Sequence, residues 1–133
     1  MSERYDAIIL GAGPAGLTAA IYLARARLVP LIVDTGTVGG QMVLSYEVAN
    51  YPGVESTTGH SIARTMLRQA ESFGAKVISQ ATITGLDLSG ETKVVKVEDE
   101  GIFESPILII AAGGRSRRLG LAKRIALRPR AFS

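Results

Sequence analysis

Cysteine and tryptophan are absent from this 133-residue chain. Without cysteine, no disulfide, thiolate metal site or thiol nucleophile can form within it. Long hydrophobic runs are also absent: the longest, residues 107–112, is too short to cross a bilayer. The beginning of the chain has no signal-peptide pattern. We therefore expect a cytoplasmic protein with no membrane partner.

Histidine is nearly absent. His60 is the single one, and no carboxylate or nucleophile stands at a spacing that would make it a catalytic base. We expect it to be exposed at the start of a helix. The sequence thus predicts no catalytic residue and no metal ligand.

Acidic residues are missing from one end of the chain. Residues 1–111 hold all 12 Asp and Glu, whereas residues 112–133 are rich in Arg and Lys and hold none. A basic segment of this kind can attract phosphate groups. However, no nucleic-acid-binding motif accompanies it, so we do not expect nucleic acid as the main partner. We predict one domain over residues 1–121 and a basic, non-homologous tail over residues 122–133.

The amino-acid composition, with 47% hydrophobic and 20% charged residues, is typical of a globular domain. The first part of the sequence predicts a strand at 7–10, a glycine turn, a helix at 15–28 and a strand at 31–33, which together form a βαβ unit. The continuous apolar run 107–112 is typical of a strand buried on both faces of a parallel sheet.

Between these strands we predict a helix at 61–73 and a strand at 76–79, followed by an antiparallel meander of strands at 81–88, 93–98 and 102–104. Gly74 is placed to end the helix. Its inward face is expected to comprise Ile62, Met66, Leu67, Ala70 and Phe73. The predicted fold class is α/β: a Rossmann-like domain with a parallel sheet plus a small antiparallel meander.

The glycine turn has the spacing Gly11-x-Gly13-x-x-Gly16. The first glycine permits a tight turn, the second lets the backbone approach a pyrophosphate, and the third allows the helix to pack closely on the strand. Asp34 ends the next strand, where a carboxylate can accept hydrogen bonds from ribose hydroxyls. Strand, turn, helix and acidic residue together predict a dinucleotide-binding site.

Four ordered motifs carry a family resemblance. They are residues 5–16 (YDAIILGAGPAG), 39–41 (GGQ), 47–53 (EVANYPG) and 108–113 (LIIAAG) followed by Arg117 and Leu119-Gly120. From residue 5 to about 121, the chain resembles the thioredoxin reductases, which are flavoproteins with two dinucleotide-binding domains. Two positions depart from the family pattern, because Asp34 stands where Glu is commoner and Ala112 stands where Thr is usual.

The resemblance implies FAD as the cofactor. The pyrophosphate would lie at the glycine turn, the adenosine ribose at Asp34, the adenine near the main chain at residues 82 and 83, and the flavin and ribityl chain near residues 40, 41 and 50. The implied cofactor-binding residues are Gly11, Gly13, Pro14, Ala15, Gly16, Asp34, Gly39, Gly40, Gln41, Asn50, Thr82, Ile83, Ala111 and Gly113.

The resemblance also implies an FAD-dependent oxidoreductase of the thioredoxin-disulfide reductase type. In that family, NADPH reduces FAD and a Cys-x-x-Cys pair passes electrons to thioredoxin. This chain has neither the pair nor a second glycine fingerprint. We therefore expect a truncated FAD-binding segment that is not catalytically competent alone. As a separate expectation, a homodimer is possible. The expected NADPH and thioredoxin belong to a full-length relative.

Two alternatives remain open. One is the FAD-binding part of a ferredoxin–NADP reductase-like flavoprotein, which would have a ferredoxin-type partner and no redox disulfide. The other is a non-catalytic truncated domain whose basic tail binds anions. The sequence around residues 50–53 favours the thioredoxin reductase interpretation.

Overall fold

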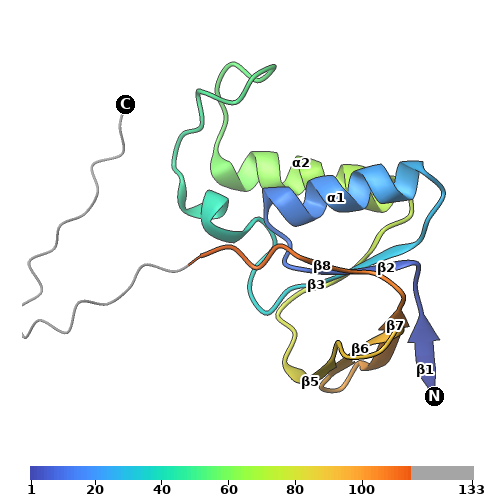
Figure 1. Cartoon of the computed structure of the whole chain (residues 1–133). Helices are drawn as coiled ribbons and strands as arrows, with labels where there is room; N and C mark the ends of the chain where they lie inside the picture. Colours follow the sequence, from blue (N-terminus) through green and yellow to red (C-terminus); the bar gives the residue numbers. More distant parts are fainter. Residues whose placement is uncertain (115–133) are drawn as a thin grey trace, which may run out of the picture.

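The computed structural model of the protein describes residues 1–114 and has three layers (Figure 1). Two helices form the first layer, a parallel sheet the second and a smaller mixed sheet the third. The elements in chain order are β1 (Ser2–Arg4), β2 (Ala7–Leu10), α1 (Pro14–Arg25), β3 (Pro30–Val33), the 3₁₀ helix η1 (Gly40–Leu44), α2 (Gly59–Ser72), β4 (Lys76–Ile78), β5 (Ile83–Asp87), β6 (Lys93–Val97), β7 (Gly101–Ser105) and β8 (Leu108–Ile110).

The middle layer is a parallel sheet with strand order β4-β3-β2-β8. Side chains of successive residues point to opposite faces. Ile9 and Ile32 therefore pack towards the helices, whereas Ile8, Leu31 and Val33 pack towards the other sheet. All five are at most 1% exposed. Burial on both faces explains why β2 and β3 are continuous apolar runs. The prediction of full burial for the run 107–112 is wrong in the described residues, because Ile107 and Ile110 are 47% and 68% exposed and β8 is the last described strand of its sheet.

The third layer is a sheet with strand order β1-β7-β6-β5. Its β5, β6 and β7 form the predicted antiparallel meander. Strand β1, which adds to β7 in parallel, was not predicted from the sequence. Its residues are polar and exposed, so backbone hydrogen bonds hold the strand in place. The sequence there has no hydrophobic pattern that would predict a strand.

Helix α1 ends at Arg25, three residues before the predicted end. The chain leaves it through a turn in which Arg27 has a φ of 63° and the N–H of Leu28 donates to the carbonyl of Leu23 at 3.1 Å. This left-handed helix end usually contains glycine or asparagine. Arginine in that place gave no stop signal in the sequence.

Helix α2 begins at Gly59, where the Thr58 hydroxyl oxygen accepts a hydrogen bond from the N–H of Ser61 at 3.1 Å. Its predicted inward face is confirmed except at Phe73, which is 48% exposed. That ring lies outside the core, with the Arg25 guanidinium 5.8 Å from its centre. His60 is exposed at the helix start, as predicted.

The chain crosses from β7 to β8, and so between the sheets, through a turn at Ser105. This side chain is completely buried. Its hydroxyl donates to the carbonyl of Ile107 at 2.8 Å and accepts from the N–H of the same residue at 3.1 Å. Strand β8 is shorter than the predicted run 107–112. Over residues 1–114, neither helix has the length and apolar character needed to span a membrane.

Candidate functional site

Gly11 and Gly16 are required by packing. Gly11 has a φ of 114°, and a Cβ there would lie 2.1 Å from the carbonyl oxygen of Ala111. A Cβ on Gly16 would lie 1.9 Å from the carbonyl oxygen of Gly11. These two glycines bring the end of β2, the start of α1 and the end of β8 into direct backbone contact, as the fingerprint predicts.

Gly13 has a different role, because a Cβ there would have no atom of residues 1–114 within 4 Å. It precedes α1, which has no side-chain cap and no acidic residue in its first turn. The first backbone bond is donated by Leu17 to the carbonyl of Gly13 at 3.0 Å, so the amides of Ala15 and Gly16 precede the helical hydrogen bonds. Free N–H groups and the helix dipole make this end suitable for an anion.

Asp34 connects the glycine turn to the loop after β3. One carboxylate oxygen accepts from the N–H of Ala12 at 2.7 Å, and the other accepts from the N–H of Gly36 at 2.8 Å. Carboxylate oxygens have further lone pairs, so each can accept another bond. The backbone N–H of Asp34 donates to the carbonyl of Ile78 at 2.9 Å, which fixes the residue at the end of β3, beside β4.

A second glycine pair packs against the first turn. The N–H of Gly39 donates to the carbonyl of Ala12 at 2.7 Å. A Cβ on Gly39 would lie 2.5 Å from Val43 and 2.7 Å from Ala63, whereas one on Gly40 would lie 3.4 Å from the Cα of Gly13. The 3₁₀ helix η1 is thereby held beside the start of α1.

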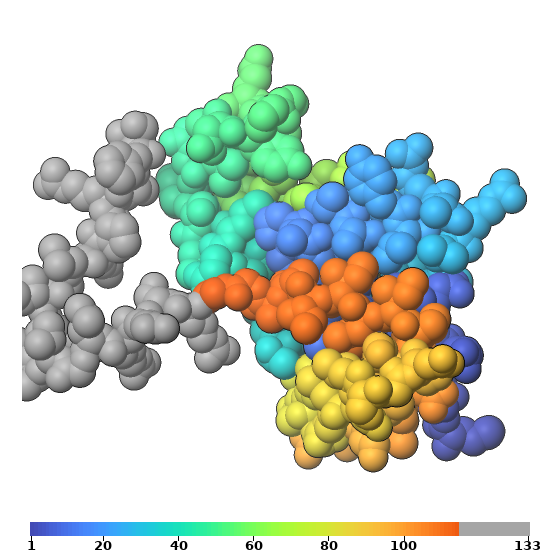
Figure 2. Space-filling model, viewed as in Figure 1, coloured from blue at the N-terminus to red at the C-terminus, as the bar shows by residue number. Residues whose placement is uncertain are grey.

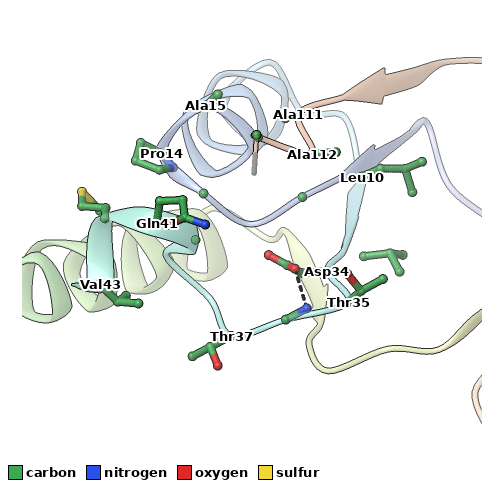
Figure 3. A pocket seen from close by; sticks show the side chains of 18 of the residues that line it. Leu10, Pro14, Ala15, Asp34, Thr35, Thr37, Gln41, Val43, Ala111 and Ala112 are labelled. Carbon is green, nitrogen blue, oxygen red and sulfur yellow. Dashed lines mark hydrogen bonds between the residues drawn. The ribbon is translucent and has the colours of Figure 1, made fainter. Parts of the chain in front are cut away.

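These segments enclose a cavity of about 800 Å³. Figure 3 shows Asp34 between the glycine turn and the Thr35–Thr37 loop, with Gln41 near Pro14. Among the residues that the structure describes, Asp34 is the single charged one in the lining, and the rest are mainly apolar or glycine. The lining residues are Leu10, Gly11, Gly13, Pro14, Ala15, Val33, Asp34, Thr35, Gly36, Thr37, Gly40, Gln41, Met42, Val43, Leu44, Ile83, Ala111, Ala112, Gly113 and Gly114.

The structure brings together most of the residues that the sequence predicted for the site. Gly16 and Gly39 are buried behind the lining and support it. Thr82 and Asn50 are exposed and do not line the cavity. The predicted members that line it are Gly11, Gly13, Pro14, Ala15, Asp34, Gly40, Gln41, Ile83, Ala111 and Gly113.

Three parts of the lining were not predicted from the sequence. They are the Thr35–Thr37 loop, the apolar face of η1 with Met42, Val43 and Leu44, and four residues at or after strand ends, Leu10, Val33, Ala112 and Gly114. The Gly39-Gly40 pair was the available signal, because it showed that the chain turns back after Asp34. Arg117, Leu119, Gly120 and the predicted tail lie outside the described residues.

A comparison with protein families matches residues 5–128 to the pyridine nucleotide-disulphide oxidoreductase model. The thioredoxin reductase of Peptoclostridium acidaminophilum is 42% identical over 121 residues, which cover 90% of this chain and 38% of the relative. That of Bacillus subtilis is also 42% identical, over 123 residues, covering 91% and 38%. This chain therefore spans about two fifths of the length of these relatives.

Solved structures agree. The crystal structure of Lactococcus lactis thioredoxin reductase superimposes with a TM-score of 0.79 at 37% identity, covering 88% of this chain and 38% of that one. The resemblance and the Rossmann-like fold class predicted from the sequence are both confirmed. Because the family model covers most of the chain and the fold agrees, this protein belongs to the pyridine nucleotide-disulphide oxidoreductase family.

Proposed function

We propose that this chain binds FAD and is the FAD-binding part of an NADPH-dependent flavoprotein of the thioredoxin reductase type. The observation that carries the proposal is Gly13, whose open Cβ position lies at the uncapped start of α1 on the wall of the large cavity. A site for an uncharged ligand would not need free helix N–H groups that a ligand can reach without meeting a side chain.

The pyrophosphate would bind at Gly13, Pro14 and Ala15. Pro14 has no N–H, but it holds the first turn in helical geometry, so the following amides point at the cavity. The absence of an acidic residue from this turn leaves the positive end of the helix dipole uncompensated by the helix's own side chains. The negative charge of two phosphate groups can compensate this positive end.

The adenosine would lie on the other side of Asp34. Its carboxylate is held by Ala12 and Gly36, and the remaining lone pairs are available to ribose hydroxyls. Although Asp is one methylene shorter than the commoner Glu, both of its oxygens are fixed, which lowers the cost of ordering them on binding. Ile83 supplies an apolar wall for the adenine.

The flavin would lie along η1 and the end of β8. Gln41 offers an amide near Pro14, and Met42 and Leu44 provide apolar surface. When bound, FAD supplies the electron-transfer chemistry, while these residues orient it and exclude water. The roles of Asn50 and Thr82, which the resemblance implied, stay predictions.

NADPH, thioredoxin and the disulfide exchange belong to the proposal for a full-length protein, because the chain spans only part of its relatives. A ferredoxin-type partner is the alternative acceptor. A cytoplasmic location also stays a prediction.

The test is a visible absorption spectrum of the purified chain after FAD has been added and excess FAD removed. We expect a retained flavin spectrum. Anaerobic NADPH should then leave it unbleached if the chain lacks a nicotinamide site. Loss of all flavin on removing the excess would contradict FAD binding. Bleaching would show that the chain binds and oxidises NADPH by itself.

A further inference from the structure

The 3₁₀ helix η1 forms a wall of the cavity and packs against α2. All of its residues, 40–44, line the cavity. In Figure 2 the turquoise atoms of this part of the chain lie directly beside the blue start of α1 and the orange end of β8. A shift of η1 therefore changes the shape of the cavity.

The first residue of α2, Gly59, is buried and makes backbone contact with the end of η1. A Cβ on Gly59 would lie 1.8 Å from the carbonyl oxygen of Met42 and 3.0 Å from that of Ser45. The N–H of Gly59 donates to the carbonyl of Ser45, and the N–H of Ser45 donates to the carbonyl of Met42, both at 3.0 Å. Because Gly59 has no positive φ, glycine is required here for space and not for conformation.

Ala63, one turn further along α2, supports the other end of η1. It is 2% exposed, and a Cβ built on Gly39 would lie 2.7 Å from its methyl carbon. Gly59 and Ala63 are four positions apart and so lie on the same face of the helix. This face of small residues lets α2 and η1 approach closely. Since Gly40 also lies against Gly13, η1 is packed between α2 and the glycine turn.

We propose that Gly59 is a positioning residue of the cofactor site. By letting η1 pack directly on α2, it sets the place of η1 relative to the start of α1, and so the fit of the flavin half of the cofactor. The inference rests on the FAD binding proposed above. The ADP half of FAD would instead contact Gly13, Ala15 and Asp34, which belong to the start of α1 and the end of β3. A change at Gly59 should therefore affect the two halves differently.

The test compares the dissociation constants for FAD and for ADP, which has the adenosine and both phosphates of FAD but no flavin. Gly59→Ala adds a methyl group that must push the Met42 carbonyl away. We expect the dissociation constant for FAD to rise at least about fivefold, and that for ADP to change by less than about twofold. Calorimetric titration measures both. The visible absorption bands of bound FAD should also shift, because η1 takes a new position beside the flavin.

Two control variants separate positioning from stability. Thr58→Ala removes the hydroxyl that accepts from the N–H of Ser61 at 3.1 Å, but it leaves Gly59 unchanged. It should lower the melting temperature and keep the ratio of the two dissociation constants. Gly90→Ala makes the same chemical change in the turn between β5 and β6, where the new Cβ meets the Thr92 carbonyl oxygen at an ordinary 3.7 Å. It should change neither affinity.

Hydrogen exchange on the unmodified protein adds a measurement that needs no variant to fold. If α2 positions η1 for the flavin, FAD should in turn stabilise this contact, because coupling between two sites is reciprocal. FAD should therefore slow exchange of the Gly59 and Ser45 amides, whereas ADP should not. The amide of Gly74, which donates to Glu71 at the other end of α2, should respond alike to both ligands.

Three results would overturn this proposal alone, with FAD binding intact. They are an unchanged FAD affinity in Gly59→Ala, equal losses of FAD and ADP affinity in a folded Gly59→Ala protein, and exchange at Gly59 that FAD does not slow. Failure of the unmodified protein to bind FAD would overturn both this proposal and the function proposed above.

Discussion

The carboxylate of Asp34 accepts a hydrogen bond of 2.7 Å from the backbone N–H of Ala12, which lies 22 positions earlier in the chain. This bond ties the end of β3 to the glycine turn. Through its other oxygen, Asp34 also holds the N–H of Gly36 at 2.8 Å. One side chain thus fixes the two backbone segments that border the proposed adenosine site.

Replacing Asp34 with Asn should weaken FAD binding. The amide nitrogen of Asn is a donor and faces a backbone donor wherever it replaces a carboxylate oxygen. Losing a hydrogen bond to a charged acceptor costs about 1.5–3 kcal/mol, so the dissociation constant for FAD should rise at least about tenfold. Fluorescence titration with FAD measures it.

The control makes the same chemical change at Asp99, an exposed turn residue with a φ of 62°. Asn tolerates this conformation, so Asp99→Asn should leave FAD binding unchanged. Equal affinities for Asp34→Asn and the unmodified protein would contradict the role given to Asp34.

Gly13→Ala should weaken FAD binding and spare the fold, whereas Gly16→Ala should destabilise the fold. The new Cβ at residue 13 meets no atom of the described part of the chain within 4 Å, and the φ of −75° suits alanine. The fold should therefore survive, with a loss of at most about 1 kcal/mol from the poorer N-cap. FAD affinity should fall at least about tenfold, because the methyl group occupies the phosphate approach.

Gly16→Ala instead places a Cβ 1.9 Å from the carbonyl oxygen of Gly11. Overpacking of this kind costs about 1–3 kcal/mol or more, so its melting temperature should fall clearly without any ligand. Thermal unfolding with and without FAD separates the two effects. A Gly13→Ala protein that binds FAD normally would show that the pyrophosphate lies elsewhere.

Ser105→Ala should destabilise the connection between the sheets. Its buried hydroxyl accepts a hydrogen bond from the N–H of Ile107 at 3.1 Å. An unsatisfied buried donor costs about 1–3 kcal/mol. Urea unfolding should show a loss of this size, whereas Ser72→Ala, at an exposed helix end, should change stability by less than about 0.5 kcal/mol. A Ser105→Ala protein as stable as the original would mean that water or a shifted backbone replaces the hydroxyl.

The turn after β5 should respond to acid. Hydrogen bonds from the side chain and backbone of Ser89 lower the pKa of Asp87 below its ordinary value of 3.8, and Lys93 and Lys96 add to this. Because the folded pKa is lower than the unfolded one, the stabilisation is present above about pH 4 and disappears as the pH falls through the folded pKa.

Ser89→Ala removes the hydroxyl donor at 2.7 Å and should move the pKa of Asp87 upwards, towards its ordinary value. Titration of the carboxyl carbon by NMR measures the change. Ser79→Ala, at an exposed site after β4, is the control and should leave the pKa in place. An unchanged pKa in Ser89→Ala would assign the effect to the backbone N–H of Ser89 and to the lysines.

The sequence predicted the βαβ unit and the glycine turn well, because both depend on local signals: an apolar strand, three spaced glycines and Asp34. The missed features depend on contacts between distant segments. Strand β1 exists because β7 offers an edge about 100 positions later. The left-handed Arg27 is set by the path to β3, and the lining by Thr35, Thr37 and Val43 follows from how η1 docks on Gly13.

The Gly11–Ala111 contact also bears on how the protein folds during synthesis. The cavity wall is made from residues 10, 11, 13–15, 33–37, 40–44, 83 and 111–114, so its last part is translated about 100 positions after its first. Contacts between such distant segments form slowly, because the chain between them must lose entropy before the contacts can stabilise the fold. On a ribosome, α1 would form early with the glycine turn open on one side. The cofactor site could close only after residue 114 has emerged from the exit tunnel.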